Sequence, residues 1–146
     1  MVECTKFRNK NRGYMKLEVW QKSIELYRII WKIIYEDLKL DFKLRSQLAD
    51  ATQSFSANIA EGYSRRSIKE YIQFLYISLS CLSDALTRII GLKVTNQITE
   101  EQFKSMDSLH YEIENKLLRL VESLERKRDD GTWVDYVSDE IAEYNP

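Results

Sequence analysis

The chain has 146 residues, which is the size of a single domain and enough to bury a substantial core. Its four Gly and single Pro argue against a fold of many tight turns and favour long helices. Two distant Cys argue against a disulfide framework or zinc knuckle, and no apolar run suits a signal peptide or membrane span, so we expect a cytoplasmic protein without membrane contact.

The net charge of −1 conceals an uneven distribution along the chain. All 22 Lys and Arg lie in residues 1–128, whereas six of the 23 Asp and Glu lie in residues 129–146, which contain no base. Residues 1–16 carry five bases and one acid. We therefore divide the chain into a basic N-terminal arm (1–16), a nearly neutral body (17–128) and an acidic C-terminal tail (129–146).

The basic arm has no apolar period over residues 1–13, so we expect a mobile or partner-ordered segment. Its bases suit nucleic-acid phosphates, because Lys and Arg placed at phosphates release condensed counterions. The candidates for such contacts are Arg8, Lys10 and Arg12. Two other interpretations stay open: a solvated terminus, and an arm that pairs with the acidic tail.

The acidic tail has apolar residues at steps of four, four and three with acids between them. This spacing predicts a short amphipathic helix, which is too short to be stable alone and needs a surface on which to dock. That surface is another subunit, the basic arm or a separate protein, and a disordered tail is the alternative. The candidate partner-binding residues are Trp133, Val137, Ile141 and Tyr144.

A first helix is predicted over residues 17–39, where two apolar seams run side by side. One seam contains Trp20, Tyr27 and Trp31, and the other contains Ile30. Together they form an apolar face wider than an ordinary surface helix presents to one neighbour. Either this helix lies deep in its own bundle, or part of the face packs on another subunit, a role that amphipathic aromatic residues suit.

A helical hairpin is predicted in the centre of the chain, residues 47–79. Asp41 is a suitable N-cap for its first helix, which is rich in small residues and is expected to stop at Gly62. Asn58 and Glu61 near that end are expected to bond backbone groups across the turn, because helix ends leave carbonyls and amides without partners.

The second helix of the hairpin is predicted from Ser67, which forms a capping-box pattern with Glu70, to about Lys93. Apolar residues at steps of four and three make one continuous seam along it. Cys81 lies on a neighbouring stripe that changes from large to small residues, so we expect a buried, unreactive thiol.

Three bases lie around the connection of this hairpin: Arg65, Arg66 and Lys69. Bases at the start of a helix, near exposed amides and the positive end of the helix dipole, form a reasonable phosphate-binding site. A solvated loop requires the same residue types, so both interpretations stand on the sequence alone.

A last helix is predicted to begin at Thr99, which forms a second capping-box pattern with Gln102, and to end among the bases of residues 125–128. His110, the single His of the chain, falls in its apolar seam. Because no Cys or carboxylate cluster accompanies it, we expect a core histidine bonded to a neighbour and no metal site.

Motifs for catalysis are absent from the sequence. It contains no nucleotide-binding loop, GxSxG elbow, HExxH motif or carboxylate pair, and one His with scattered Cys leaves little acid-base chemistry. We therefore predict a protein that is not an enzyme and has no cofactor.

Three blocks carry a resemblance to a known family: Leu17–Lys22 (LEVWQK), Asn58–Gly62 (NIAEG) followed by Ser67, and Phe74–Ile77 (FLYI). They resemble the bacterial four-helix-bundle family of ribosomal RNA intervening-sequence proteins and the accessory variability determinant of diversity-generating retroelements. The resemblance covers about residues 14–127. It implies an all-α, antiparallel up-down-up-down four-helix bundle that assembles as a homopentamer, with retroelement members that engage a reverse transcriptase and nucleic acid.

Two departures from this family bear on function. Ala49 and Asp50 stand where the family tends to place paired arginines, and Gln73 stands where a base usually precedes Phe74. The body is also nearly neutral, whereas the retroelement members are strongly basic. These differences weaken the expectation of direct nucleic-acid binding.

Two hypotheses of function follow. The preferred one is an oligomeric helical scaffold that binds RNA or DNA, as an accessory to a reverse transcriptase or another nucleic-acid enzyme. The alternative is a protein-interaction module without direct nucleic-acid binding, whose partner docks on the tail or on the wide face of the first helix. A sharper version of the first has the acidic tail competing for the basic surface.

Overall fold

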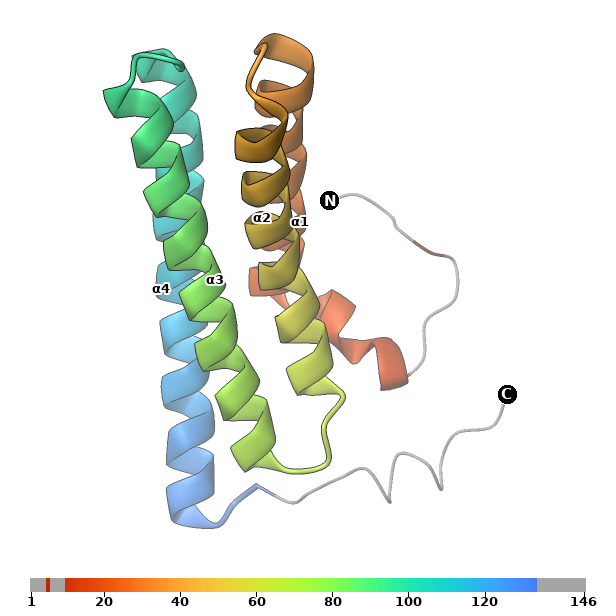
Figure 1. Ribbon diagram of the computed structural model, residues 1–146. Helices are drawn as coiled ribbons and strands as arrows, with labels where there is room; N and C mark the ends of the chain where they lie inside the picture. The colour runs from red at the N-terminus through yellow and green to blue at the C-terminus, as the bar shows by residue number, and fades with distance from the viewer. Residues whose placement is uncertain (1–4, 6–9, 134–146) are drawn as a thin grey trace.

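The computed structural model of the protein describes residue 5 and residues 10–133. Four long helices dominate the described chain (Figure 1). They are α1 (Glu18–Trp31), α2 (Phe42–Tyr63), α3 (Ile68–Val94) and α4 (Glu100–Asp130), with a 3-10 segment η1 (Lys10–Lys16) before α1 and a π-helical segment η2 (Lys32–Asp37) after it.

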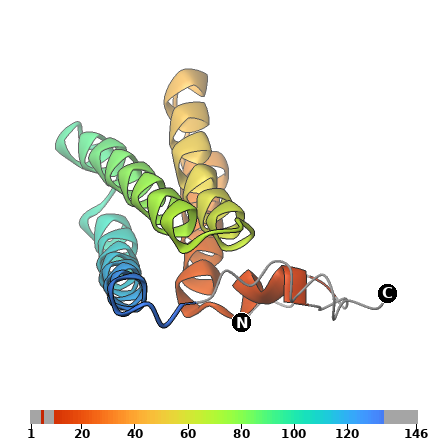
Figure 2. The same ribbon diagram turned by 90° about the horizontal axis from the view of Figure 1, so that it is seen from below.

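The four helices form an antiparallel up-down-up-down bundle, as predicted (Figures 1 and 2). Each helix contacts the next one in sequence, and α1 also contacts α4, so the helices surround a single core. We call the end with the α2–α3 turn and the C-terminus of α4 the basic end. The other end, where the α1–α2 and α3–α4 hairpins separate, is the open end (Figure 1).

The predicted caps fix the starts of three helices. The Asp41 carboxylate accepts from the backbone N–H of Lys43, and the Ser67 hydroxyl accepts from the N–H of Glu70. At α4, Thr99 and Gln102 form both bonds of a capping box, at 3.1 and 2.9 Å. Each cap satisfies amides that a first helical turn leaves unpaired, so these sequence patterns locate the helix starts to within a residue.

The end of α2 differs from the prediction. Gly62 does not stop the helix, which continues through Tyr63, and Gly62 serves instead to bring two helices together. A Cβ at Gly62 would lie 2.7 Å from the Cβ of Phe74 and 3.3 Å from the backbone carbonyl oxygen of Tyr71, both on α3. The residue is therefore required by the close approach of α2 to α3 and not by an unusual backbone conformation.

Two of the polar side chains buried in the core form a hydrogen bond to a neighbouring helix. His110 is 3% exposed, and its Nε2 lies 2.9 Å from the carbonyl oxygen of Leu82 on α3. This confirms the prediction of a core histidine bonded to a neighbour. The hydroxyl of Ser78, fully buried on α3, donates to the carbonyl oxygen of Phe55 on α2 at 3.1 Å. Both bonds tie neighbouring helices together in a low-dielectric setting.

The wide apolar face of the first helix is only partly covered. Leu26 and Ile30 lie in the core, whereas Trp31 is 42% exposed and stacks on Tyr35 with ring centroids 4.1 Å apart. The guanidinium of Arg45 lies 5.2 Å from the Tyr35 ring centroid. The helix also changes to π-helical geometry after Trp31, which the apolar spacing did not indicate.

The third helix is long and apolar enough to cross a membrane by length and composition, with a mean hydropathy of 1.3 over its best 18-residue window. A third of that window is buried inside the bundle. Core helices of water-soluble bundles meet the same criterion, so this property does not assign α3 to a membrane.

Candidate nucleic-acid interface

Three segments that are far apart in the sequence lie toward the basic end: residues 61–70 form the turn, with residues 10–16 on one side of it and residues 125–130 on the other (Figures 1 and 2). The up-down topology dictates this arrangement. A chain that passes through four antiparallel helices starts α1, turns between α2 and α3, and ends α4 at the same end of the bundle. Charges carried by these segments are therefore brought to the same end of the bundle.

A ladder of aromatic rings holds the segments together. Tyr14 of η1 contacts Trp20 and Tyr63 with centroid distances of 5.4 and 6.3 Å. Tyr63 in turn contacts Tyr71 at 5.8 Å, and Tyr71 contacts Trp133 at 6.5 Å. All four pairs meet edge to face, the arrangement that aromatic quadrupoles favour. The ladder thus links η1, the helix ends on either side of the α2–α3 turn, and Trp133, which lies three residues after the end of α4.

The basic arm is docked at its C-terminal part. Gly13 lies directly on Tyr63, so that a Cβ at Gly13 would overlap the Tyr63 hydroxyl. Met15 is 8% exposed, and its carbonyl oxygen accepts from the Gln21 side chain at 2.9 Å. Residues 10–13, expected as part of a mobile or partner-ordered segment, therefore belong to η1 (Lys10–Lys16), which carries Arg12 and Lys16.

The basic end carries an excess of positive charge. The three segments together contain nine Lys and Arg against five Asp and Glu. The bases are Lys10, Arg12, Lys16, Arg65, Arg66, Lys69, Arg126, Lys127 and Arg128. The side chains of the eight bases other than Lys10 are described, and an excess of bases at one end of a molecule is the electrostatic footprint that nucleic-acid phosphates recognise.

Most acids of the basic end are engaged by neighbours. The Glu61 carboxylate pairs with Arg65 at 2.6 Å, and Glu70 accepts from the Ser67 hydroxyl at 3.1 Å. Glu125 accepts from the Tyr76 hydroxyl at 2.6 Å, and this hydrogen bond raises the pKa of the Tyr76 phenol. Engaged carboxylates oppose an approaching phosphate less than free ones, because a neighbouring donor offsets part of their charge.

The bases of the basic end divide into engaged and open groups. Arg65 pairs with Glu61 and lies over the Phe74 ring at 4.6 Å, so its guanidinium is held against the protein. Arg66, Lys69 and Arg126 are exposed, and within the described part of the chain their side chains form no ion pair. We call these three the open basic group, and Lys16 of η1 meets the same two criteria.

Other predicted site residues fall partly outside the described chain. Arg8 and the tail residues Val137, Ile141 and Tyr144 lie there, as does the side chain of Lys10. Of the predicted partner-binding residues, Trp133 is described: its ring is half-buried, packs on Tyr71 and has the Lys127 ammonium 5.8 Å from its centroid.

The bases at the end of α4 were not predicted as part of this surface. The sequence pattern suggested only that Arg126 and its neighbours complement the helix dipole. The signal that could have placed them is the topology itself, because the last turn of a fourth antiparallel helix lies beside the turn between the second and third.

The polar residues before the α2–α3 turn form bonds along their own helix. Asn58 donates to the carbonyl oxygen of Ser54 at 2.8 Å and contacts the Cys81 sulfur at 3.8 Å, while Glu61 pairs with Arg65 one turn on. The expectation that Asn58 and Glu61 bond backbone groups across the turn is therefore wrong. The reason is that both side chains find a partner four residues away in sequence.

Cys81 is half-buried, where full burial was expected. Burial and the nearby Asp84 carboxylate raise the pKa of its thiol, and the Asn58 contact opposes that shift. A raised pKa leaves the sulfur protonated and weakly nucleophilic at neutral pH. Among the described residues, no group of three or more His, Cys, Asp or Glu side chains is arranged to hold a metal ion.

Comparison with known proteins places the chain in a family. The model of the 23S rRNA-intervening sequence protein family matches residues 15–119. A crystal structure of a protein with unknown function from the S23 ribosomal protein family of Bacteroides thetaiotaomicron is similar to this chain, with a TM-score of 0.64. The two sequences are 27% identical, and the match covers 71% of this chain and 95% of that one. No curated protein matches the chain. Neither match indicates an enzymatic family. The chain belongs to the 23S rRNA-intervening sequence protein family.

Proposed function

We propose that this protein is a non-enzymatic, cytoplasmic, oligomeric scaffold that binds RNA or DNA through its basic end. The observation that supports the proposal is that three distant segments bring eight described bases to the same end of the bundle, with most of the acids there engaged by neighbours. By the resemblance to retroelement proteins, we further propose that it works beside a nucleic-acid enzyme such as a reverse transcriptase.

The open basic group would supply the phosphate contacts. Lys69 lies in the first turn of α3, where the positive end of the helix dipole adds to its charge. Arg66 lies just before this turn and Arg126 comes from α4, so the three side chains approach a ligand from two helices and a loop. Contacts of this kind neutralise phosphates without reading base sequence. We therefore expect binding with little sequence preference.

Oligomerisation would make weak sites effective. A single basic end with few open bases binds phosphate weakly, whereas several copies in one assembly hold the same nucleic acid together. The pentamer implied by the family resemblance would repeat the open basic group around an axis. Affinity would then depend on whether one nucleic acid is long enough to reach several subunits.

The test is equilibrium binding of a labelled structured RNA and a mixed-sequence DNA over a salt series. The variant Arg66→Ala/Lys69→Ala should bind more weakly, and the slope of log affinity against log salt should fall by about 1 for each phosphate that the variant no longer neutralises. Lys32→Ala/Lys104→Ala is the matched control, since it removes the same charge from exposed positions away from the basic end. Absence of binding by the natural chain at low salt, or equal weakening in both variants, would reject the proposal.

A second candidate function is a protein-interaction module that uses the wide face of α1. The exposed Trp31, its stacking on Tyr35 and the adjacent Arg45 favour it, because Trp, Tyr and Arg dominate the energetics of protein interfaces. If this function is the correct one, Trp31→Ala abolishes capture of a protein partner, and the Arg66→Ala/Lys69→Ala variant retains it. If instead Trp31→Ala retains capture and the Arg66→Ala/Lys69→Ala variant loses it, the result would support the nucleic-acid scaffold.

A further inference from the structure

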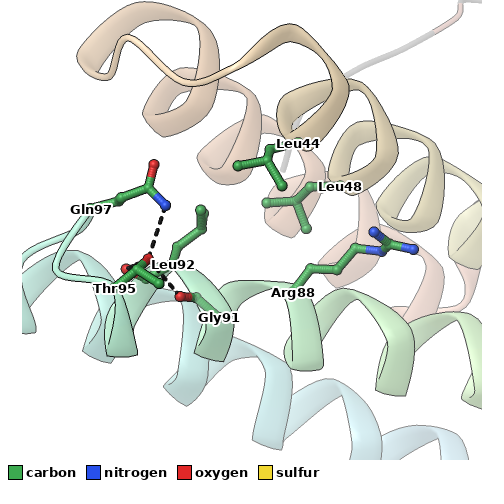
Figure 3. Close-up of a pocket in the computed structure, with 7 residues that line it drawn as sticks. All are labelled: Leu44, Leu48, Arg88, Gly91, Leu92, Thr95 and Gln97. Atoms are coloured by element: carbon green, nitrogen blue, oxygen red, sulfur yellow. Dashed lines mark hydrogen bonds between the residues drawn. The ribbon is translucent and has the colours of Figure 1, made fainter.

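A cavity of about 300 Å³ lies at the open end, between the first turns of α2 and the last turns of α3 (Figure 3). Leu44 and Leu48 line it from α2, and Leu92 lines it from α3. Arg88 stands at one side, where its guanidinium bonds to Gln47 at 2.9 Å and to Asp84 at 3.2 Å. The walls are thus mainly aliphatic, with a single cation at the edge.

Gly91 also lines this cavity, and no described part of the chain explains it. A Cβ at Gly91 would meet no atom of the described residues within 4 Å, and its backbone has ordinary helical geometry. Glycine at a helical position nonetheless costs about 0.5–1 kcal/mol relative to Ala. Neither a turn nor a close contact among the described residues requires this glycine. Its presence is accounted for if another molecule approaches the backbone of α3 at this position.

A large apolar side chain projects from the same end of the molecule. Phe42, the first residue of α2, is 69% exposed, and its neighbour Leu44 at the cavity is 43% exposed. On α3, Ile90 and Val94 flank Gly91 with exposures of 42% and 71%. The open end therefore carries both an unfilled apolar cavity and an unburied aromatic ring, surrounded by further apolar surface.

We infer that Phe42 of one copy inserts into the open-end cavity of a second copy of this chain. The chain itself supplies the two complementary parts, a projecting ring and a cavity. The Arg45 guanidinium lies 5.6 Å from the centroid of the Phe42 ring, which is still 69% exposed, and no described side chain fills the cavity. The inference rests on the oligomeric part of the proposed function and assigns a surface to it.

The dimensions and chemistry of the two parts match. A cavity of about 150 Å³ lined by aliphatic side chains is enough to hold a benzene ring, so a phenyl group fits the larger cavity here together with its Cβ. The ring would lie on leucine side chains and beside the Arg88 guanidinium, which is attracted to an aromatic face. Close approach to the α3 backbone is open because Gly91 has no side chain.

The test measures self-association of the full chain by sedimentation equilibrium over a range of concentrations. Phe42→Ala removes the ring and Gly91→Leu fills the cavity, and each should weaken association by about tenfold or more, since each removes the burial of one large apolar side chain. Ser83→Leu is the matched control for Gly91→Leu, because it adds the same side chain at an exposed position of α3 outside the cavity. Circular dichroism of each variant establishes that the helices are intact.

Mixing the two variants separates this inference from a general loss of assembly. The Phe42→Ala chain keeps its cavity and the Gly91→Leu chain keeps its ring, so a mixture should regain association that neither has alone. Mixing that restores nothing, or association insensitive to both substitutions, would overturn the inference while leaving nucleic-acid binding and oligomerisation through another surface intact. A natural chain that stays monomeric would overturn the inference and the oligomeric part of the proposed function together. Nucleic-acid binding is measured separately, and its dependence on Arg66 and Lys69 tests that part of the proposed function on its own.

Discussion

Gly62 and Gly91 are both helical glycines, but their environments differ. Substitution of each by Ala should therefore change the free energy of unfolding in opposite directions. At Gly62 an added Cβ would lie 2.7 Å from the Cβ of Phe74, and neither atom is at the end of a flexible side chain. The α2 and α3 backbones must therefore separate. At Gly91 the added Cβ would enter open space.

The magnitudes follow from two opposing effects. Overpacking costs about 1–3 kcal/mol, and replacing a helical Gly by Ala stabilises by about 0.5–1 kcal/mol. Gly62→Ala should thus lower the free energy of unfolding by about 1–2 kcal/mol, whereas Gly91→Ala should raise it by up to about 1 kcal/mol.

Urea denaturation followed by circular dichroism measures both changes, at equal protein concentrations because association contributes to stability by mass action. Unchanged m-values would show that the two variants unfold the same structure. If Gly62→Ala were as stable as the natural chain or more so, the close α2–α3 approach could not be the reason for this glycine.

Three further outcomes are expected. Thr99→Ala removes the N-cap bond of α4, which is one of the two bonds of its capping box, and should lower the free energy of unfolding by about 1 kcal/mol in the same urea assay. His110→Leu should lower it by about 1–3 kcal/mol, because it removes the buried bond to Leu82, and His110→Gln, which keeps a donor, should recover part of the stability; equal effects would mean that the bond contributes nothing. In a chain whose other cysteine is serine, Cys81 should react with iodoacetamide slowly at neutral pH and faster as pH rises, since burial and Asp84 raise the pKa of its thiol. Asp84→Asn should shift that rate profile to lower pH, and an unchanged profile would remove Asp84 as a cause.

Local patterns in the sequence were sufficient to predict the bundle. Asp41, Ser67 and Thr99 each bond an amide at the start of a helix, and such bonds depend only on residues within one turn. The apolar seam of α4 placed His110 in the core for the same reason, since its period is a property of the helix alone. The fold class followed from these elements and the short connections between them.

Features that depend on contacts between helices were not predictable in the same way. The role of Gly62 requires the position of Phe74 on α3, and a helical glycine before a turn looks the same in sequence whether it ends a helix or allows a close contact. The π-helical segment after Trp31 has no sequence period that distinguishes it from an α-helix.

The candidate site was predictable in part. Arg66 and Lys69 are close in sequence and were identified together, whereas Arg126 joins them only through the topology of the bundle. That Arg65 is held by Glu61 and Phe74 required side-chain geometry. The sequence therefore indicated that this surface is positively charged, but it did not indicate which of its bases are free of ion pairs among the described residues.

The aromatic ladder of the basic end has a consequence for how the molecule comes into being. Its rings come from residues as distant as Tyr14 and Trp133, and contacts of such long sequence separation form late, after the loop-closure entropy of the intervening chain has been overcome. The individual helices and hairpins can form earlier from local contacts. During synthesis, the bases of η1, the α2–α3 turn and α4 would thus remain on separate pieces of chain until the last helix is complete. We expect a growing or partly unfolded chain to lack the assembled surface, so that only the finished bundle presents it to a polyanion.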